Sequence, residues 1–378
     1  MWVSSRQMED RKKEVTTMRI VIFAGGTGRR LWPISRQSSP KQFEPIVGES
    51  STLQLAVERV APRYGMESIY VATNERYEAI IRGQLPGLPA NNIIFEPARR
   101  DLGPAVGLAM AHMAKDSLNE AVAILWSDNY IENVPAFGQL LSTAEQLVND
   151  GKAEIVFIGE TPRFANENLG WIGLGSQVGE LGDIPYYGFE SLTYRPPLER
   201  CREIFEQGTH VWNTGFFVTT PAYIQRLYRR FSPDLWRQIE IIESSISTDE
   251  YGDVLSRLYP ELPAISFDDA ILTHLDAGDA LVLHSSMGWS DPGTLYALKE
   301  VINPVIDANV TKGLVIDSES QDCLIYNYES DKLLVAVGLE GMIVVNTDDA
   351  ILVVHKDQIP LVKSVINELQ GTDLESYS

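Results

Sequence analysis

Short apolar runs alternate with amphipathic stretches over the first third of the chain, and this rhythm limits the fold more than any other feature. The runs MRIVIFA, SIYVAT, NIIFE and AVAILWS are rich in Val and Ile, and helix-like stretches such as AVGLAMAHMA lie between them. Unbroken apolar runs are typical of strands buried on both faces of a mainly parallel sheet, with amphipathic helices covering it. The sequence therefore predicts an α/β fold, on which ligands bind at the carboxyl ends of the strands.

The pattern changes after about residue 305. Short β-rich runs such as CLIYNY and AILVVH follow one another there, with a closing helix-like stretch from Pro360 to Leu369. This predicts a second, all-β domain, and a sandwich and a stacked β-coil fit the pattern equally well. We expect a disordered extension over residues 1–17, a large α/β domain over residues 18–304 and a small β-rich domain over residues 305–378.

The charge of the chain excludes several classes of function. A formal net charge of -21 argues against a nucleic-acid partner, because a polyanion would be repelled. No stretch reaches the roughly 20 apolar residues of a membrane span, and the polar N-terminus lacks the apolar core of a signal peptide. Cys201 and Cys323 lie far apart and suggest neither a disulfide framework nor a zinc site. We expect a cytoplasmic protein that acts on small molecules.

A glycine-rich loop follows the first predicted strand. Gly25, Gly26 and Gly28 would let backbone N–H groups approach phosphate oxygens, although such a cluster is equally typical of a tight turn. Arg30 and Lys41 supply local positive charge that could neutralise the phosphates of a nucleotide. The spacing fits neither the dinucleotide pattern G-x-G-x-x-G nor a phosphate loop ending in Lys and Ser or Thr. A dinucleotide oxidoreductase and a P-loop kinase are therefore disfavoured.

Residues 23–43, FAGGTGRRLWPISRQSSPKQF, resemble the signature of sugar-nucleotide pyrophosphorylases, and LWPISR followed by PKQF resembles its mannose-1-phosphate guanylyltransferase form. Further segments occur in the order of that family: EPARRDLGPAVGLA, LWSDNYI, WNTGFF, SFDDAI, WSDPGTL and GLEGMIVVNTDDAILVVHKD. The resemblance runs from Met18 to Leu369. It implies the nucleotide-diphospho-sugar transferase fold, with a Rossmann-like mixed, mainly parallel sheet flanked by helices and a left-handed β-helix-like coil at the C-terminus.

The resemblance also assigns roles to individual residues. Arg30 and Lys41 would be the catalytic cations, and two aspartates at strand ends, Asp128 and Asp291, would hold Mg2+. Either aspartate alone would more commonly be a cap or a turn former. The remaining assignments are Gly25, Gly26, Thr27, Gly28, Arg29, Glu96, Arg100 and Gly103 to the nucleotide, and Gly170, Tyr194, Arg195 and Asn213 to the sugar phosphate.

The sequence departs from the family on the sugar and base side. Tyr194 stands where the family has a sugar-directed Glu, and Arg195 stands where it has a phosphate-binding Lys. Asn129 replaces a common His, and Leu102 replaces a Thr. Because Asp128, Asp291 and Lys41 are retained, we expect the chemistry to be preserved, while the specificity is open.

The prediction is GMP transfer from GTP to α-D-mannose 1-phosphate, giving GDP-mannose and pyrophosphate by a Mg2+-assisted in-line displacement. An ionised sugar phosphate needs no nucleophilic side chain, so catalysis would rest on positioning and charge stabilisation. Two alternatives remain: the same chemistry with another sugar 1-phosphate, such as a manno-heptose, or another NTP, and a non-catalytic nucleotide sensor. The C-terminal domain could support a homodimer.

Overall fold

The structure is a computed structural model that describes residues 18–26, 31–36 and 38–378. The predicted extension over residues 1–17 lies outside the described residues. Four predicted site residues also lie outside them: the nucleotide contacts Thr27, Gly28 and Arg29, and the catalytic cation Arg30.

A nine-stranded sheet forms the centre of the α/β domain, in the order β3-β2-β1-β4-β8-β5-β9-β7-β6. Strands β3, β2, β1 and β4 pair in parallel, as does β5 with β9, whereas β8 is antiparallel to both of its neighbours β4 and β5. The prediction of a mixed sheet is confirmed. The strands are β1 Arg19–Phe23, β2 Ile69–Asn74, β3 Ile93–Glu96, β4 Val122–Trp126, β5 Ile155–Glu160, β6 Gly170–Leu181, β7 Ile184–Tyr194, β8 His210–Thr219 and β9 Leu281–Ser285.

Two apolar cores cover the two faces of this sheet, which explains the unbroken apolar runs. Ile20 and Ile22 of β1 belong to one core, whereas Val21 and Phe23 belong to the other. Residues of α1 and α4 build the first core, and residues of α3, α6 and α7 build the second. The helices of the domain are α1 Thr52–Tyr64, α2 Glu78–Gln84, α3 Leu102–Asp116, α4 Val134–Asn149, α5 Leu198–Gln207, α6 Pro221–Phe231, α7 Pro233–Ser245, α8 Tyr251–Leu258, α9 Phe267–Ala270 and α10 Leu295–Ile302.

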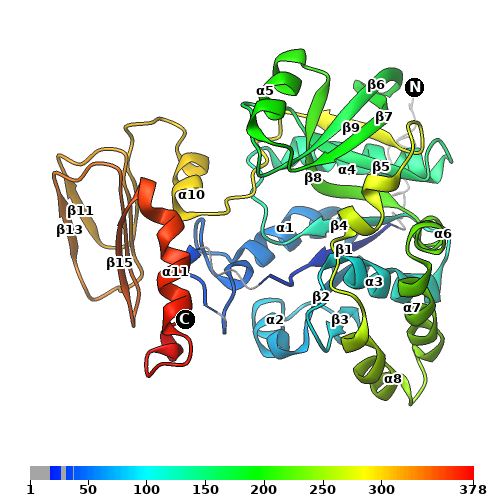
Figure 1. Cartoon of the computed structure of the whole chain (residues 1–378), viewed down its shortest axis with the longest axis horizontal. Coiled ribbons are helices and arrows are strands. Elements are labelled where there is room, and N and C mark those ends of the chain that lie inside the picture. Colours follow the sequence, from blue (N-terminus) through cyan, green and yellow to red (C-terminus); the bar gives the residue numbers. More distant parts are fainter. Residues whose placement is uncertain (1–17, 27–30, 37) are drawn as a thin grey trace, which may run out of the picture.

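The C-terminal part is a stacked β-coil, which decides between the two predicted forms. Successive turns of the chain pair in parallel, as β10-β12-β14 in one sheet and as β11-β13 in another, and only β15 returns antiparallel to β14. Figure 1 shows this domain at one end of the molecule, with α11 on the side that faces the α/β domain. The elements are β10 Val310–Lys312, β11 Val315–Ser318, β12 Leu324–Asn327, β13 Leu334–Val337, β14 Met342–Asn346, β15 Ile351–His355 and α11 Ile359–Leu369.

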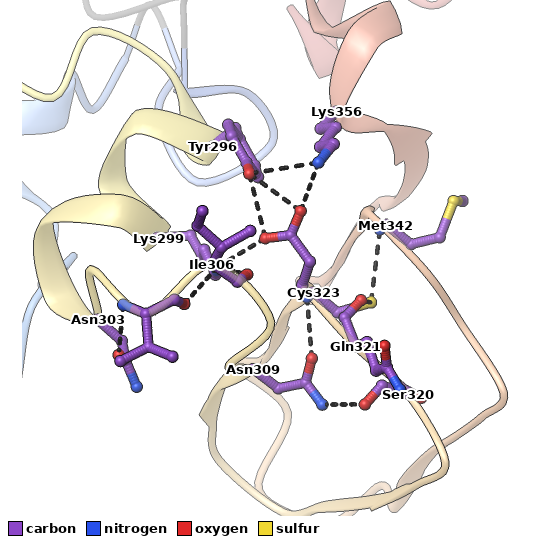
Figure 2. A network of polar contacts seen from close by, with 12 residues as sticks. Tyr296, Lys299, Asn303, Ile306, Asn309, Ser320, Gln321, Cys323, Met342 and Lys356 are labelled. Atoms are coloured by element: carbon purple, nitrogen blue, oxygen red, sulfur yellow. Dashed lines mark hydrogen bonds and ion pairs between the residues drawn. The ribbon is translucent and has the colours of Figure 1, made fainter.

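A buried ion-pair network joins α10 to the β-coil (Figure 2). The carboxylate of Asp322 accepts hydrogen bonds from Lys299 at 2.6 Å, from Lys356, and from the hydroxyl of Tyr296 at 3.0 and 3.1 Å. Lys299 also donates to the backbone carbonyls of Val305 and Ile306. Burial alone would raise the pKa of Asp322, but the hydrogen bonds from the two lysines and the tyrosine lower it. The charges of this junction are thus satisfied internally.

Within the described ranges, no helix has both the length and the apolar content needed to cross a membrane.

Candidate active site

A cavity of about 330 Å³ opens at the carboxyl ends of the central strands. The ends of β1, β3 and β4 border it on one side, and the edges of β6, β7 and β8 border it on the other. This is the position that the parallel half of the sheet predicts for a ligand. Predicted site residues that line it are Gly25, Gly26, Glu96, Asp128, Gly170, Tyr194, Arg195, Asn213 and Asp291.

The described start of the glycine-rich loop is held in place by a buried glutamine. Gln42 Nε2 donates to the carbonyl oxygens of Ala24 and Gly26, both at 3.2 Å, and Thr73 Oγ1 donates to Ala24 at 2.8 Å. Gln42 is only 1% exposed. These contacts fix the backbone that would approach the phosphates, a role for Gln42 that sequence reasoning missed although the residue lies inside the PKQF motif.

Lys41 lies between the two aspartates predicted to bind metal. Its Nζ is 2.7 Å from Asp128 Oδ2 and 3.3 Å from Asp291 Oδ1. The two loops that carry these aspartates are joined by a pair of backbone hydrogen bonds between Tyr130 and Ser290, each 3.0 Å long. Lys41 and Asp291, 250 positions apart in the sequence, are therefore brought together.

The donor set at this point suits Mg2+. Mg2+ takes hard oxygen ligands and is usually held by one or two carboxylates together with the phosphates of the substrate. Asp128 and Asp291 are each about one-third exposed toward the cavity, so a metal–phosphate complex could reach them. A group of three or more His, Cys, Asp or Glu side chains able to hold a metal by themselves is absent from the part of the chain that the structure describes. The two aspartates would need substrate phosphates to complete the coordination.

A second ion pair supports the loop that carries Asp291. Glu160, at the end of β5, is 1% exposed and accepts a hydrogen bond from the backbone N–H of Met287 at 3.0 Å. Arg163 donates to Glu160 at 2.8 Å and to the carbonyl of Trp289 at 3.0 Å, and its guanidinium lies 5.0 Å from the ring of Trp212. This brace, Glu160 with Arg163, connects the metal loop to the strand that carries Asn213. No motif in the sequence signalled it.

Glu96, which the sequence predicts to contact the nucleotide, is a buried carboxyl group. It ends β3, is 9% exposed and accepts a hydrogen bond of 2.6 Å from the hydroxyl of Tyr259. Burial raises the pKa of Glu96 to about 7, although the Tyr259 hydrogen bond opposes the shift. A carboxyl group in this state can be protonated or ionised near neutral pH.

Two other residues predicted for the nucleotide, Arg100 and Gly103, do not line the cavity, whereas Arg99 and Asp101 do. Gly103 packs instead: its N–H donates to the carbonyl of Ile265, and an added Cβ would lie 2.8 Å from that oxygen. The close approach of the Ile265 backbone therefore explains why position 103 is a glycine.

The sugar-side predictions converge through strand register. Gly170 of β6 is paired with Tyr194 of β7 on one side and with Asn213 of β8 on the other. Arg195 follows Tyr194 directly, and its guanidinium lies 5.0 Å from the Tyr194 ring. Four residues from three separate sequence segments thus share one wall of the cavity.

Asn213 is oriented by its own turn. Its Oδ1 accepts a hydrogen bond from the N–H of Gly215 at 2.9 Å, which directs Nδ2 toward Asp268 Oδ1 at 3.5 Å. Gly215 has a φ of 77°, and a Cβ there would lie 2.0 Å from Nε1 of Trp126. Sequence reasoning quoted the SFDDAI segment but gave no role to Asp268, which lines the cavity. Burial raises its pKa to about 6.

Known protein families match both parts of the chain. The family described as nucleotidyl transferase matches residues 19–307, and the family described as MannoseP isomerase/GMP-like beta-helix domain matches residues 313–369. A solved structure described as a mannose-1-phosphate geranyltransferase from Thermus thermophilus superposes with a TM-score of 0.82 at 27% identity, covering 94% of this chain and 99% of that one.

Curated relatives extend the likeness. The mannose-1-phosphate guanylyltransferase RfbM of Salmonella typhimurium is 31% identical over 94% of this chain and 73% of its own length. The alginate biosynthesis protein AlgA of Pseudomonas aeruginosa is 30% identical over 93% of this chain and 72% of its own length. With a family match over residues 19–307 and relatives of this identity and coverage, the chain belongs to the nucleotidyl transferase family, among the mannose-1-phosphate guanylyltransferases.

Proposed function

We propose that this chain transfers GMP from GTP to α-D-mannose 1-phosphate, producing GDP-mannose and pyrophosphate, with Mg2+ as its cofactor. The observation that carries the proposal is the position of Lys41 between Asp128 and Asp291, beside the cavity that Gly170, Tyr194 and Asn213 border. One end of the cavity can gather phosphates, and the other offers hydrogen-bonding groups to a sugar. The names of the relatives supply the identities of the two substrates.

The reaction needs little covalent chemistry from the protein. An oxygen of the sugar phosphate, already ionised at neutral pH, bonds to the α-phosphorus of GTP as the bond from that phosphorus to the β-phosphate oxygen breaks. Bound Mg2+, held by Asp128 and Asp291, would screen the charge of the phosphates. Lys41 would then turn from the aspartates to the phosphates and stabilise the negative charge on the leaving pyrophosphate. The described start of the glycine-rich loop would align the triphosphate.

The two substrates would bind on opposite sides of the cavity. Arg195 can bind the phosphate of the sugar, and Asn213 can donate from Nδ2 to a sugar hydroxyl. Guanine presents two neighbouring donors, N1–H and the N2 amino group, and the carboxylate of Glu96 is a matching acceptor. Tyr259 would hold that carboxylate in place through its hydrogen bond.

Pyrophosphate release tests this proposal. Purified protein with Mg2+ would be assayed with GTP, ATP, UTP and dTTP against mannose, glucose and heptose 1-phosphates. We expect the strongest signal with GTP and mannose 1-phosphate, and its loss on removal of Mg2+ by a chelator or on substitution Asp128→Ala. Asp276→Ala, at an exposed surface ion pair with Arg230, is the control that should retain the signal.

One observation favours a second candidate, the same chemistry on a different sugar 1-phosphate. Tyr194 occupies the sugar wall with 37% of its surface exposed, where a carboxylate would accept hydroxyl hydrogen bonds. Tyr194→Glu should then improve the use of mannose 1-phosphate markedly. Under the first proposal the same substitution leaves mannose use unchanged or lowers it. A protein that binds GTP but releases no pyrophosphate from any pair would instead be a nucleotide sensor.

We further propose that the chain acts in the cytoplasm and forms a homodimer through its β-coil. Ile316 of β11 is paired with Val335 of β13, and these residues are 53% and 55% exposed. Val337, also in β13, is 63% exposed. An outward apolar surface of this kind suits a self-complementary contact. Light scattering should show a dimer that Val335→Asp converts to a monomer, and Glu319→Asp, on the same coil, should remain dimeric.

A further inference from the structure

We infer that Asp268 is a specificity-determining residue that accepts hydrogen bonds from the hydroxyl groups of the sugar. The inference deepens the proposed function and rests on it for the class of substrate, a sugar 1-phosphate. It assigns a role to a residue that neither the glycine-rich loop nor the metal site requires.

The first argument is position. Asp268 comes from the short helix α9, yet its carboxylate reaches the wall that strands β6, β7 and β8 build, where Nδ2 of Asn213 lies 3.5 Å from Oδ1. Both residues line the same cavity as Gly170 and Tyr194. A ligand in contact with Asn213 would therefore meet Asp268 as well.

The second argument is hydrogen-bonding capacity. A distance of 3.5 Å is at the long limit for a hydrogen bond, so neither side chain is saturated by the other. Asn213 presents a fixed donor because Gly215 already occupies its oxygen, and Asp268 presents an acceptor. A sugar hydroxyl both donates and accepts. The adjacent donor and acceptor therefore match a pair of neighbouring hydroxyls on one ring.

The third argument is charge. Lys41 pairs with the two aspartates of the proposed metal site and offsets one of their two charges, whereas the carboxyl group of Asp268 is governed mainly by burial, which raises its pKa to about 6. Neighbouring Asp269 and Asp101 also disfavour its charge, whereas Arg195 favours it. A carboxylate with these neighbours would repel the phosphates and accept hydrogen bonds from neutral hydroxyls. The Arg195 guanidinium remains available for the phosphate of the same sugar.

The fourth argument is the lack of an acidic side chain at the position of Tyr194. Tyr194 offers the sugar wall a ring and a phenol in place of an acid, and its ring is covered on one side by the Arg195 guanidinium. Asp268 reaches the same wall from α9 and supplies the missing acceptor. An acceptor on α9, in place of one at the position of Tyr194 on β7, would hold the sugar ring from a different direction. This difference would select among epimers.

The test pairs substitutions with substrates that lack single hydroxyls. Kinetics of pyrophosphate release would be measured for wild-type protein, Asp268→Ala and Asp268→Asn with mannose 1-phosphate and its 2-, 3- and 4-deoxy analogues. We expect one deoxy analogue to cost the wild type about 10- to 100-fold in kcat/KM, the range for a hydrogen bond to a charged group. The same analogue should cost Asp268→Ala less than about 3-fold, because the acceptor is already gone. The KM for GTP should not change.

Matched controls and the contrary outcomes make the test decisive. Asp276→Asn, at the exposed surface ion pair with Arg230, should behave as wild type. Asp268→Asn keeps the shape of the side chain, and serves if Asp268→Ala does not fold. Equal losses of kcat/KM for all deoxy sugar analogues in every variant would overturn the inference. So would the finding that Asp268→Ala changes the loss caused by 2'- or 3'-deoxy GTP and not the loss caused by a deoxy sugar.

Failure of the proposed function looks different. If the wild type uses another sugar 1-phosphate, the same series is run with the deoxy analogues of that sugar, and the inference is judged there. If no pair releases pyrophosphate, the proposed function fails. Calorimetric binding of mannose 1-phosphate then decides the role of Asp268: binding that Asp268→Ala weakens about 10-fold or more supports it, and equal or absent binding overturns it.

Discussion

The acidic side chains at the two ends of the cavity have opposite environments: those at one end are paired with a lysine, and those at the other are buried. At the metal end, Lys41 pairs with both Asp128 and Asp291, so one of their two negative charges is compensated before any ligand binds. At the recognition end, where the base and the sugar would bind on opposite sides of the cavity, burial raises the pKa of Glu96 to about 7 and that of Asp268 to about 6. The first arrangement would offer negative charge to a cation and a lysine to phosphates. The second keeps acceptors for neutral hydrogen-bond donors.

The largest effect is expected for the stability of the protein, at Asp322, a carboxylate that is also paired with lysine but is buried at the junction of α10 and the β-coil. Asp322→Ala would leave Lys299, 1% exposed, without its carboxylate, and loss of one partner of a buried pair costs about 3–5 kcal/mol. Denaturant unfolding should show this loss. Lys332→Ala removes an exposed pair with Glu329 and should change stability by less than about 0.5 kcal/mol. Equal effects of the two substitutions would contradict the buried pairing.

At the metal end, Lys41→Met removes the cation and should affect catalysis more than folding. We expect kcat to fall by about 10²–10³-fold, as for the loss of one transition-state charge partner. Lys41→Arg should restore only part of the activity, because the planar guanidinium needs different room. Steady-state kinetics at saturating GTP would measure this. Full activity of Lys41→Met would remove Lys41 from the catalytic group.

At the recognition end, Glu96 should make stability depend on pH. Its pKa is raised from 4.5 to about 7, so the folded state binds more protons than the unfolded state in that window, and the free energy of unfolding falls as pH rises through it. Relative to wild type, Glu96→Gln should gain up to about 3 kcal/mol between pH 5 and pH 7.5. Denaturant titrations at the two pH values check this. Parallel behaviour of the two proteins would argue against a raised pKa.

The smallest effect concerns the brace that joins the two ends. Glu160→Gln keeps an acceptor for Met287 but loses the charge that holds Arg163, so the metal loop and the Trp212 segment should loosen together. We expect kcat to fall by on the order of 10-fold and the Mg2+ concentration for half activity to rise. Arg163→Met should do the same, whereas Arg200→Met, at an exposed pair, should not. An unchanged Mg2+ requirement would reduce the brace to a structural role.

Much of the fold could be predicted because the signals are local. Ile20 and Ile22 face one core while Val21 and Phe23 face the other, so a continuous apolar run marks a strand covered on both sides. The sequence also allowed the two aspartates of the metal end to be predicted, because Asp128 directly follows such a strand and Asp291 lies in the recognisable segment WSDPG. Local sequence therefore determined the strands, their order in the chain and the charged groups that we expect to contact the phosphates.

Only the tertiary structure decided the recognition end. Gly170, Tyr194 and Asn213 share a wall because of strand register, and β8 enters the sheet antiparallel between β4 and β5. Asp268 reaches that wall from a separate helix, and Glu160 with Arg163 forms a brace without a motif. Burial and distance between remote segments govern the pKa values and hydrogen bonds of these groups. Residue types and spacing along the chain do not determine either quantity. The sequence therefore predicted a role for Glu96 but none for Asp268 or Glu160, and it did not reveal the environment that sets the chemistry of each acid.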